Sequence, residues 1–448
     1  MGEQWRRCRD AYDGVDAVKG KGQKYLPAWG SDEQRYIEFL CRAHFYPAMA
    51  RSVEAPTGMI FRKLPTLSNV PEAMKSDLTD IDLRGNTLVG ASVDTVRELL
   101  ITGRQVIALD AADGRVFWRF YRAEDVEQYW VSSEAPYRVQ YVMFREEYQE
   151  PTFDGARITL TDAVRYRVLR INAGVVEVLV GDGKEFTRAA TLGRSSGEAL
   201  TDIPVMFLNA YGVGVEPGKP PMLDMVDTNF AHYRTSADLD HALHWSALPT
   251  PWIAGGKAGV EGTFRIGSDV AWSLPEGSKA DMLEPSGNGL SGMEKRLGTL
   301  ATEMAALGAR LITEPFRGSE ATEAVRIKSG GDGGALSSIV ATVDQAYTQL
   351  LRWHADWAGY DGEPSITLNR DFYDIKLSPQ HITALMALVQ AGVLSQETFY
   401  EQLHTGELTN PNRTFEEEKA LIAAETPPPQ PQPTNVPGAG TPTPTQGE

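Results

Sequence analysis

Apolar and polar positions repeat with two different periods along the chain, and these periods separate a mixed N-terminal part from a helical C-terminal part. Helical spacing predicts a helix over residues 32–61, with a kink or boundary at Pro47, and a helix over 91–103 that is capped by Ser92 or Asp94. Residues 104–208 instead contain short β-rich runs separated by turn sequences. The predicted strands are Arg104–Asp110, Val116–Tyr121, Val126–Val131, Tyr137–Glu146, Arg157–Leu160, Val164–Ile171, Val175–Gly181 and Ile203–Leu208. The N-terminal part is therefore predicted to have an α+β fold with an antiparallel meander.

Residues 222–312 have the pattern of two long helices joined by a short β segment. The first helix is predicted over 222–248 and ends at a Pro-Thr-Pro sequence. The second, over 287–312, has apolar residues spaced alternately three and four apart, the narrow stripe by which long helices lie along one another. We call this stripe the seam, and its residues are Leu290, Met293, Leu297, Leu300, Met304, Leu307 and Leu311.

The C-terminal part is predicted to be helical until its composition changes. A helix with a broad apolar face is expected from Leu336 to Trp357, after the Gly-rich sequence 330–334. Residues 378–425 contain three shorter helical patterns. From Thr426 to Glu448, eight of 23 residues are Pro, and the others are mostly Thr, Gln and Gly. A segment of this composition buries too little apolar surface to fold, so a disordered tail is predicted.

Charge and cysteine content narrow the class of protein. The formal net charge is −17, which disfavours a basic module that grips DNA through its phosphates. The only cysteines, Cys8 near the start and Cys41 inside an apolar helix pattern, predict neither a disulfide framework nor a zinc site. No apolar signal core is present, and no run approaches the ~18–20 apolar residues of a membrane span. We expect a soluble protein made in the cytoplasm.

No sequence pattern predicts a catalytic centre, a metal site or a cofactor site. Residues 212–221 resemble a phosphate-binding loop but lack its first Gly and its Ser or Thr, so a connector is favoured. His241 and His244 share a helix face with acidic residues, which more often is a solvated face than a metal site. The Gly-rich sequence 330–334 favours a hinge over a phosphate cradle. Trp252 and Trp272 are expected to pack the β segment or its contact with a neighbouring subunit.

Several motifs, in this order and spacing, resemble the portal proteins of tailed double-stranded DNA phages. The resemblance covers roughly residues 25–425 and excludes the Pro-rich tail. The motifs that carry it are YLPAW, YIEFLCRAHFYPAMARSVEAPTGMIFRK, PVMFLNAYGVG, MVDTNFAHYRTSADLDHALHWSALPTPWIAGG, MLEPSGNGLSGMEKRLGTLATEMAALGARLI, EATEAVRI and LMALVQAGVLSQETFYEQLHTGEL.

The resemblance implies a portal fold with named parts. These are an α/β wing (1–221), stem helices (222–248 and 287–312), a β-containing clip (249–286), a tunnel loop (313–321), a helix returning to the wing (322–377), a helical crown (378–425) and the tail (426–448). The tunnel loop would face DNA through Glu314, Pro315, Phe316, Arg317, Gly318, Ser319 and Glu320. The seam would then contact neighbouring subunits.

The resemblance also implies a role and partners. The chain would form a ring, as a dodecamer, at the capsid vertex of the virion, after synthesis in the bacterial host. Double-stranded DNA would pass through the ring without sequence specificity during packaging and ejection. Terminase, head-completion or adaptor proteins, and capsid and scaffolding proteins would be its partners, and it would be neither an enzyme nor a membrane protein. The alternatives are another capsid-associated adaptor and, less favoured, a metal-dependent hydrolase or nuclease.

Overall fold

The structure of the chain is a computed structural model with α-helices and antiparallel sheets, in agreement with the predicted α+β class. It describes residues 1–28, 30–135, 137–155, 157–246, 250–255, 276–283, 289–309, 334–370, 372, 379–405, 408–410 and 413–425. The chain divides into two compact units, Met1–Phe372 and Tyr373–Glu448. Among the described residues, none of the helices combines the length and apolar character that a membrane crossing requires.

The first unit begins with helices that the sequence analysis did not predict. Residues 1–24 form α1 (Gly2–Asp13), α2 (Val15–Gly20) and the 3-10 turn η1 (Gly22–Lys24). Cys8 is fully buried in α1, whereas Cys41 is exposed in α3 (Glu33–Arg42), so the expected environments of the two cysteines were wrong. The reason is amphipathicity: α1 has buried apolar positions among many charged ones, and its overall polarity hid them.

One buried cation attaches α1 to the rest of the unit. The Arg9 guanidinium forms ion pairs with Glu98 at 2.6 Å and with Glu124 at 2.8 Å. Glu98 belongs to α5 (Leu88–Ile101), and Glu124 to the 3-10 turn η4 (Ala123–Asp125). All three side chains are largely shielded from solvent. The Arg9 guanidinium therefore supplies the positive charge that balances both carboxylates.

The predicted helices between residues 32 and 103 are present with different ends. Pro47 is the N-cap of α4 (Ala48–Ile60), so the predicted helix over 32–61 is two helices. The N-cap of α5 is Thr87, whose hydroxyl accepts a hydrogen bond from the Gly90 amide at 3.0 Å. The predicted caps were therefore wrong, because the helix begins earlier at Leu88, and Ser92 lies inside it.

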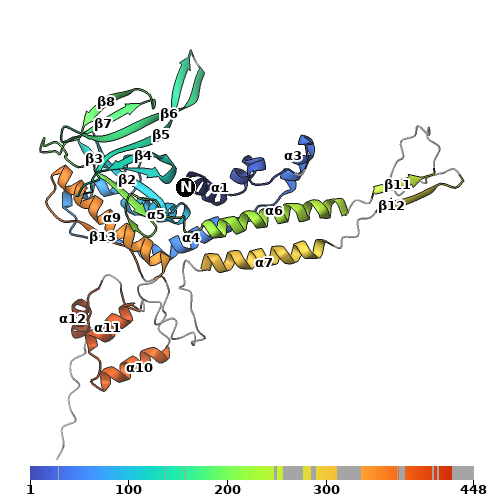
Figure 1. Cartoon of the computed structure of the whole chain (residues 1–448). Helices are drawn as coiled ribbons and strands as arrows, with labels where there is room; N and C mark the ends of the chain where they lie inside the picture. The colour runs from blue at the N-terminus through green and yellow to red at the C-terminus, as the bar shows by residue number, and fades with distance from the viewer. Residues whose placement is uncertain are drawn as a thin grey trace, which may run out of the picture. The chain divides into compact units, whose positions relative to one another are not determined.

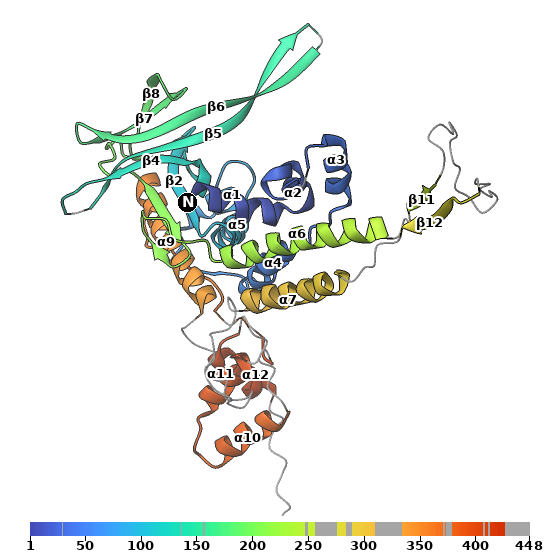
Figure 2. The same ribbon diagram turned by 45° about the vertical axis from the view of Figure 1, so that its right-hand side comes forward.

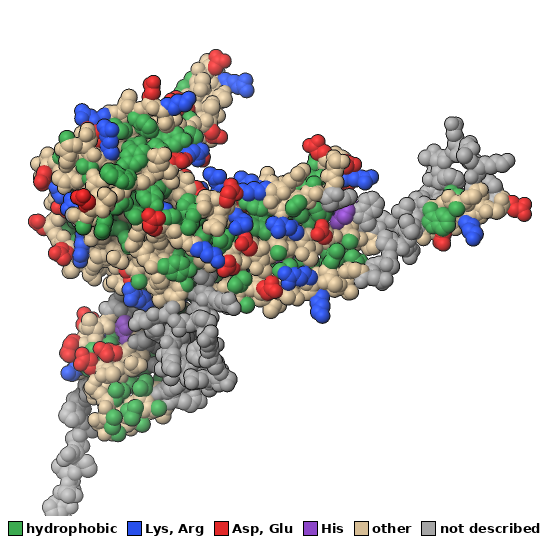
Figure 3. Space-filling model, in the orientation of Figure 1, with side chains coloured by type: hydrophobic (Ala, Val, Ile, Leu, Met, Phe, Trp, Pro, Cys, Tyr) green, Lys and Arg blue, Asp and Glu red, His purple; other side chains and the backbone are tan. Residues whose placement is uncertain are grey.

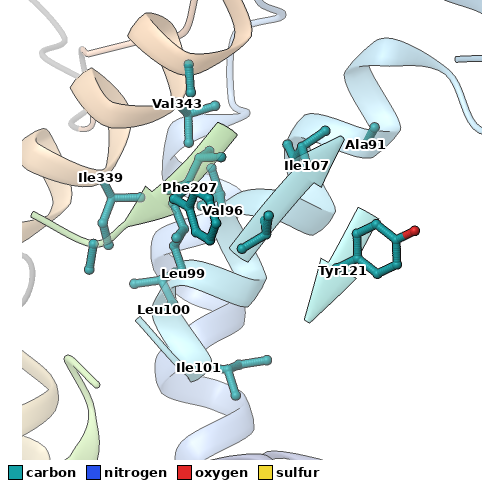
Figure 4. Packing of buried hydrophobic residues seen from close by; sticks show 14 of the residues in the cluster. Ala91, Val96, Leu99, Leu100, Ile101, Ile107, Tyr121, Phe207, Ile339 and Val343 are labelled. Atoms are coloured by element: carbon teal, nitrogen blue, oxygen red, sulfur yellow. The ribbon is translucent and has the colours of Figure 1, made fainter. Parts of the chain in front are cut away.

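A four-stranded antiparallel sheet forms the centre of the first unit. Its order is β10-β9-β2-β3, and its strands are β2 (Arg104–Ala112), β3 (Arg115–Arg122), β9 (Val205–Asn209) and β10 (Gly212–Val213). Helix α9 (Ala335–Ala358) and α5 pack against this sheet, as the labelled side chains in Figure 4 show. All eight residues of the predicted apolar face of α9 are buried: Leu336, Ile339, Val340, Val343, Tyr347, Leu350, Leu351 and Trp357.

A second sheet is a five-stranded meander in the order β4-β5-β6-β7-β8. Its strands are β4 (Val126–Val131), β5 (Val139–Asp154), β6 (Arg157–Asn172), β7 (Val175–Gly181) and β8 (Phe186–Thr191). The two strands predicted between residues 157 and 171 are one continuous strand, β6, and the largely exposed β8 was not predicted. β5 and β6 extend beyond the other strands as a long hairpin (Figures 1 and 2).

Short elements complete the first unit. β1 (Thr66–Ser68) pairs with β13 (Ser365–Thr367), and the 3-10 turns η2 (Glu72–Met74) and η3 (Asp77–Thr79) follow β1. Helices α6 (Leu223–Ser246) and α7 (Leu290–Ala309) lie side by side in Figures 1 and 2. Between them in sequence, β11 (Thr250–Ala254) pairs antiparallel with β12 (Lys279–Leu283).

The second unit contains three short helices, where the sequence predicted a helical module. They are α10 (Pro379–Gln390), α11 (Gln396–Thr405) and α12 (Phe415–Glu425). A capping box precedes α12: the Thr414 amide donates to the Glu417 carboxylate at 2.9 Å, and the Glu417 amide donates to the Thr414 hydroxyl at 3.3 Å. The predicted tail, 426–448, lies outside the described residues.

Candidate functional site

The most distinctive surface of the first unit is the pair of long helices α6 and α7, which we call the helical arm. α6 is anchored by the N-terminal segment on one side. The Asn229 amide donates to the Tyr46 carbonyl at 3.0 Å, and the Arg234 guanidinium donates to the Tyr25 carbonyl at 3.1 Å. The Phe230 ring stacks on the Tyr25 ring with 4.3 Å between centroids. α6 is therefore held on the body of the unit rather than free along its length.

The seam predicted on α7 packs within the chain. Leu300 and Met304 are buried at 1% and 4% exposure, although only one copy of the chain is present. The other described seam residues are half-buried, whereas the positions between them are mostly exposed. Because α7 lies along α6, the seam faces the chain's own helix. A role of the seam between subunits stays a prediction, and Leu311 lies outside the described residues.

The outward side of α7 carries mainly small or charged side chains, and no described residue covers it. The charges on α7 cancel to give no net charge, because its two acidic and two basic side chains are Glu294, Glu303, Lys295 and Arg296. α6 has four Asp and one Arg, a net charge of −3. Figure 3 shows acidic and basic side chains interspersed over the arm, without a basic stripe on the face in view. A surface of this composition does not accumulate phosphates.

The paired strands β11 and β12 expose apolar side chains. Trp252 lies opposite Asp281, and Pro251 lies opposite Met282. The Trp252 and Met282 side chains are 41% and 42% exposed, so the described residues do not bury them. Trp252 and Met282 lie on opposite faces of the ribbon, because successive pairs of a strand ladder alternate between its faces. Each is therefore a single exposed apolar side chain rather than part of one patch. Trp272 lies outside the described residues.

The predicted tunnel loop also lies outside the described residues. This applies to the whole set Glu314, Pro315, Phe316, Arg317, Gly318, Ser319 and Glu320, and to most of the Gly-rich sequence 330–334. The structure begins again at Gly334, the N-cap of α9. The assignment of these residues to a channel therefore stays a prediction.

The loop at residues 212–221 has the structure of a connector. The Asn209 side-chain amide donates to the carbonyls of Gly214 and Glu216, at 2.6 and 3.1 Å. The Lys219 ammonium pairs with Asp224 at 2.6 Å, at the start of α6. The lysine thus has a carboxylate partner within the chain, as expected for a connector rather than a phosphate loop.

The two histidines singled out on α6, His241 and His244, lie within one turn of each other near its end. Burial lowers the pKa of His241, and the nearby Arg42 and His244 lower it further. No group of three or more potential metal ligands occurs among the described residues.

A buried histidine network was missed by the sequence analysis. The Trp118 indole donates to His354 Nδ1 at 3.2 Å, so His354 Nε2 carries the hydrogen that faces Asp77 Oδ2, also at 3.2 Å. The Tyr360 hydroxyl donates to the same Asp77 oxygen at 3.0 Å. Burial lowers the pKa of His354 even though Asp77 opposes this, which favours the neutral imidazole. The network connects α9 to β3 and η3, and the burial of Trp118, His354 and Asp77 indicates a structural role.

A cavity of about 410 Å³ lies between β3 and the base of the β5–β6 hairpin. Its wall includes Glu146, which accepts hydrogen bonds from Arg165 at 2.7 Å and from Tyr121 at 2.8 Å. Burial alone raises the pKa of Glu146, but Arg167, Arg165, Tyr121 and Arg119 outweigh it and lower the pKa. The sequence signal for this site was the arginines at alternate positions of β6, Arg165 and Arg167. The sequence analysis did not pair them with Glu146 on β5.

Comparisons with known proteins give one family match and several distant structural neighbours. A model described as a domain of unknown function (DUF4055) matches residues 221–358, less than half of the chain. No curated protein sequence matches the chain.

Structural neighbours of the chain include chains of gene transfer agent (GTA) particles. The chain is similar to one described as "Virion of native gene transfer agent (GTA) particle", with 14% identity and a TM-score of 0.42, over 88% of this chain and 98% of that one. It is also similar to one described as "Neck of native GTA particle computed with C12 symmetry", with 14% identity and a TM-score of 0.43, over 87% and 98%. Similarity at this level assigns neither a function nor a subunit number to the chain.

Proposed function

We propose that the chain is the subunit of a portal ring, the channel at a capsid vertex through which double-stranded DNA is packaged and ejected. The observation that carries this proposal is the helical arm. The arm packs on the body of the unit through the contacts of α6, and α7 packs along α6 through Leu300 and Met304, while no described residue covers the outward side of α7. Repetition of such an arm around an axis would cover that outward side and enclose a channel.

The charge of the helical arm supports passage of DNA rather than its retention. Each Lys or Arg that neutralises a phosphate adds affinity, and strong affinity would hold DNA in place. The arm is neutral on α7 and acidic on α6. We therefore propose that DNA slides past the arm without a tight or sequence-specific contact.

The partners follow from the same proposal. Terminase, which would supply ATP hydrolysis, and head-completion or adaptor proteins would dock at the exposed Trp252 and Met282 of the β11–β12 ribbon. Capsid and scaffolding proteins would surround the body of the ring in the virion. The subunit itself would have no catalytic activity.

Electron microscopy of the full-length protein tests the ring. We expect particles with a central hole and about twelvefold symmetry, together with weak binding of a double-stranded DNA fragment at ~150 mM salt. A species that is monomeric at all concentrations would refute the proposal. A solid assembly without a hole would instead favour a capsid-associated adaptor.

The tunnel-loop assignment needs a separate experiment, because it rests on the sequence resemblance alone. Arg317→Ala is expected to reduce DNA packaging or retention in an infectious or packaging-competent particle without changing ring assembly. Unchanged packaging and unchanged retention would refute the assignment of Arg317 to a tunnel loop that faces DNA.

A further inference from the structure

The outer part of the β5–β6 hairpin has no partner elsewhere in the described chain. β5 pairs with β4 only as far as Phe144, and β6 pairs with β7 only from Tyr166 onward. Residues 147–164, which we call the distal hairpin, therefore pair only with each other, through a regular register. Nearly all of their described side chains are exposed, and the hairpin projects beyond the sheet in Figures 1 and 2. An isolated two-stranded hairpin is only marginally stable in water, so this one gains from a partner.

The two faces of the distal hairpin differ in polarity. Opposite residues of an antiparallel pair lie on the same face, so Phe153 with Ile158, and Pro151 with Leu160, form one apolar face. The other face carries Thr152 opposite Thr159, with charged residues on either side. Phe153, Ile158 and Leu160 are 68%, 64% and 58% exposed. This alternation is the pattern of a strand pair with one face buried, yet nothing described in the chain buries it.

The size of the apolar face indicates what kind of contact it makes. The three exposed apolar side chains present roughly 350 Å² of surface, which is in the range of apolar patches that mark interaction sites. A stable two-body interface needs roughly 800 Å² from each partner. The face is therefore too small to hold a dimer alone but suits one contact among several in a closed ring.

Charge indicates where this face docks. Residues 147–164 contain four acidic residues and one Arg, a net charge of −3, which disfavours nucleic acid as the partner. The cavity at the hairpin base is lined by aromatic rings, including Phe117 and Phe120, and by five arginines against four acidic residues. Two of these arginines, Arg84 and Arg122, have no carboxylate within salt-bridge distance among the described residues. The cavity thus offers apolar surface and a net charge of +1 to an acidic, apolar hairpin.

We propose that the distal hairpin of one copy docks into the cavity at the hairpin base of the next copy. This inference rests on the proposed function, because it makes the hairpin a contact between subunits of the ring. Phe153 and Ile158 pack against the aromatic lining. Asp162, which the register places on the same face as these two residues, faces Arg84 and Arg122. The outer end of the hairpin and the cavity at its base are different surfaces of the same chain, so the contact is head-to-tail and repeats until the ring closes.

Substitutions on the two hairpin faces test the contact by mass photometry of the full-length protein across a concentration series. Phe153→Asp places a charge on the apolar face, and Thr152→Asp is the matched control on the opposite face. We expect Phe153→Asp to raise the concentration needed for assembly at least tenfold, with less than a twofold change for Thr152→Asp. Both positions are exposed, and circular dichroism verifies that the fold is kept.

A charge exchange tests the assigned acceptor. Arg84→Glu with Arg122→Glu is expected to weaken assembly at least tenfold. Addition of Gln149→Arg with Asp162→Arg in the same chain, both on the apolar face of the hairpin, is expected to restore it. Failure of the second pair to restore assembly would overturn the cavity as acceptor.

Cross-linking between copies gives an independent readout. Asp154→Cys chains and Arg84→Cys chains, each in a Cys41→Ser background, are mixed and treated with a short bismaleimide. A cross-linked pair forms only if the hairpin of one copy meets the cavity of another. If the wild type forms rings but Phe153→Asp assembles normally and no cross-link appears, the hairpin contact is refuted, whereas the proposed portal ring is not. If the wild type never assembles and no cross-link appears, both the hairpin contact and the proposed portal ring are refuted.

Discussion

Replacement of Leu300 by Ala separates the two roles that a helical seam can have. Leu300 is 1% exposed in a single copy of the chain, on the side of α7 that lies along α6. If this packing holds the helical arm together, the substitution loosens α7 in the isolated subunit. If the seam instead packed against neighbouring copies, the substitution would leave the stability of α7 in the isolated subunit unchanged.

The expected magnitude follows from the burial of this side chain. A Leu→Ala change at a fully buried site costs ~2–5 kcal/mol, because it removes transferred apolar surface and leaves a cavity. At ~1.4 kcal/mol per factor of ten, local opening of α7 becomes roughly 30-fold to several thousand-fold more frequent. Leu297→Ala, at a half-buried seam position, should have a smaller effect, and Thr299→Ala, at an exposed position, almost none.

Hydrogen exchange measured by mass spectrometry on peptides from residues 290–309 is the suitable assay, because it reports on α7 separately from the rest of a chain with two units. The measurement is made on dilute, unassembled protein. The intrachain packing would be refuted if hydrogen exchange of α7 were unchanged in Leu300→Ala while assembly at higher concentration were weakened. The seam would then be assigned to the interface between copies.

Three further predictions concern stability. Arg9→Met should destabilise the first unit by ~3–5 kcal/mol in urea unfolding, because it leaves the carboxylates of Glu98 and Glu124 buried without a cation, whereas Arg6→Met at an exposed site should change it by less than ~0.5 kcal/mol. The folded-state pKa of Glu146 lies below its unfolded value, so its contribution is present at neutral pH and is lost as pH falls through the acidic range below about 4.5. Glu146→Gln should therefore show a smaller drop in Tm between about pH 7 and about pH 3.5 than the wild type. Thr414→Ala should destabilise α12 by ~1 kcal/mol, because it removes the hydroxyl of the capping box. Hydrogen exchange of residues 415–425 should become faster in this variant, while exchange in the first unit stays unchanged.

Periodicity predicted the elements that bury one clear face. The eight apolar residues assigned to the helix over 336–357 are all buried in α9, because a broad apolar stripe has no stable place except against a core. The seam on α7 was predicted from its sequence because its apolar residues also form one continuous stripe along the helix. A seam specifies that a helix packs along another helix, but not whether the other helix belongs to the same chain, so its partner needed the structure.

The rest depended on contacts between residues far apart in sequence. His354 and Asp77 are separated by 277 positions, and neither lies in a motif that points to the other. The N-terminal helix α1 escaped prediction because Arg9 and its charged neighbours mask the few buried apolar positions. The cavity beside Glu146 likewise arises only when β3 and the β5–β6 hairpin come together.

The unequal environments of the two cysteines provide a way to count copies. Cys8 is fully buried, and burial raises the pKa of its thiol to about 12, so it contains almost no reactive thiolate at neutral pH. Cys41 is exposed on α3. A maleimide fluorophore should therefore attach once per polypeptide without any engineering. Stepwise photobleaching of single labelled particles would then report stoichiometry directly, independently of any image symmetry.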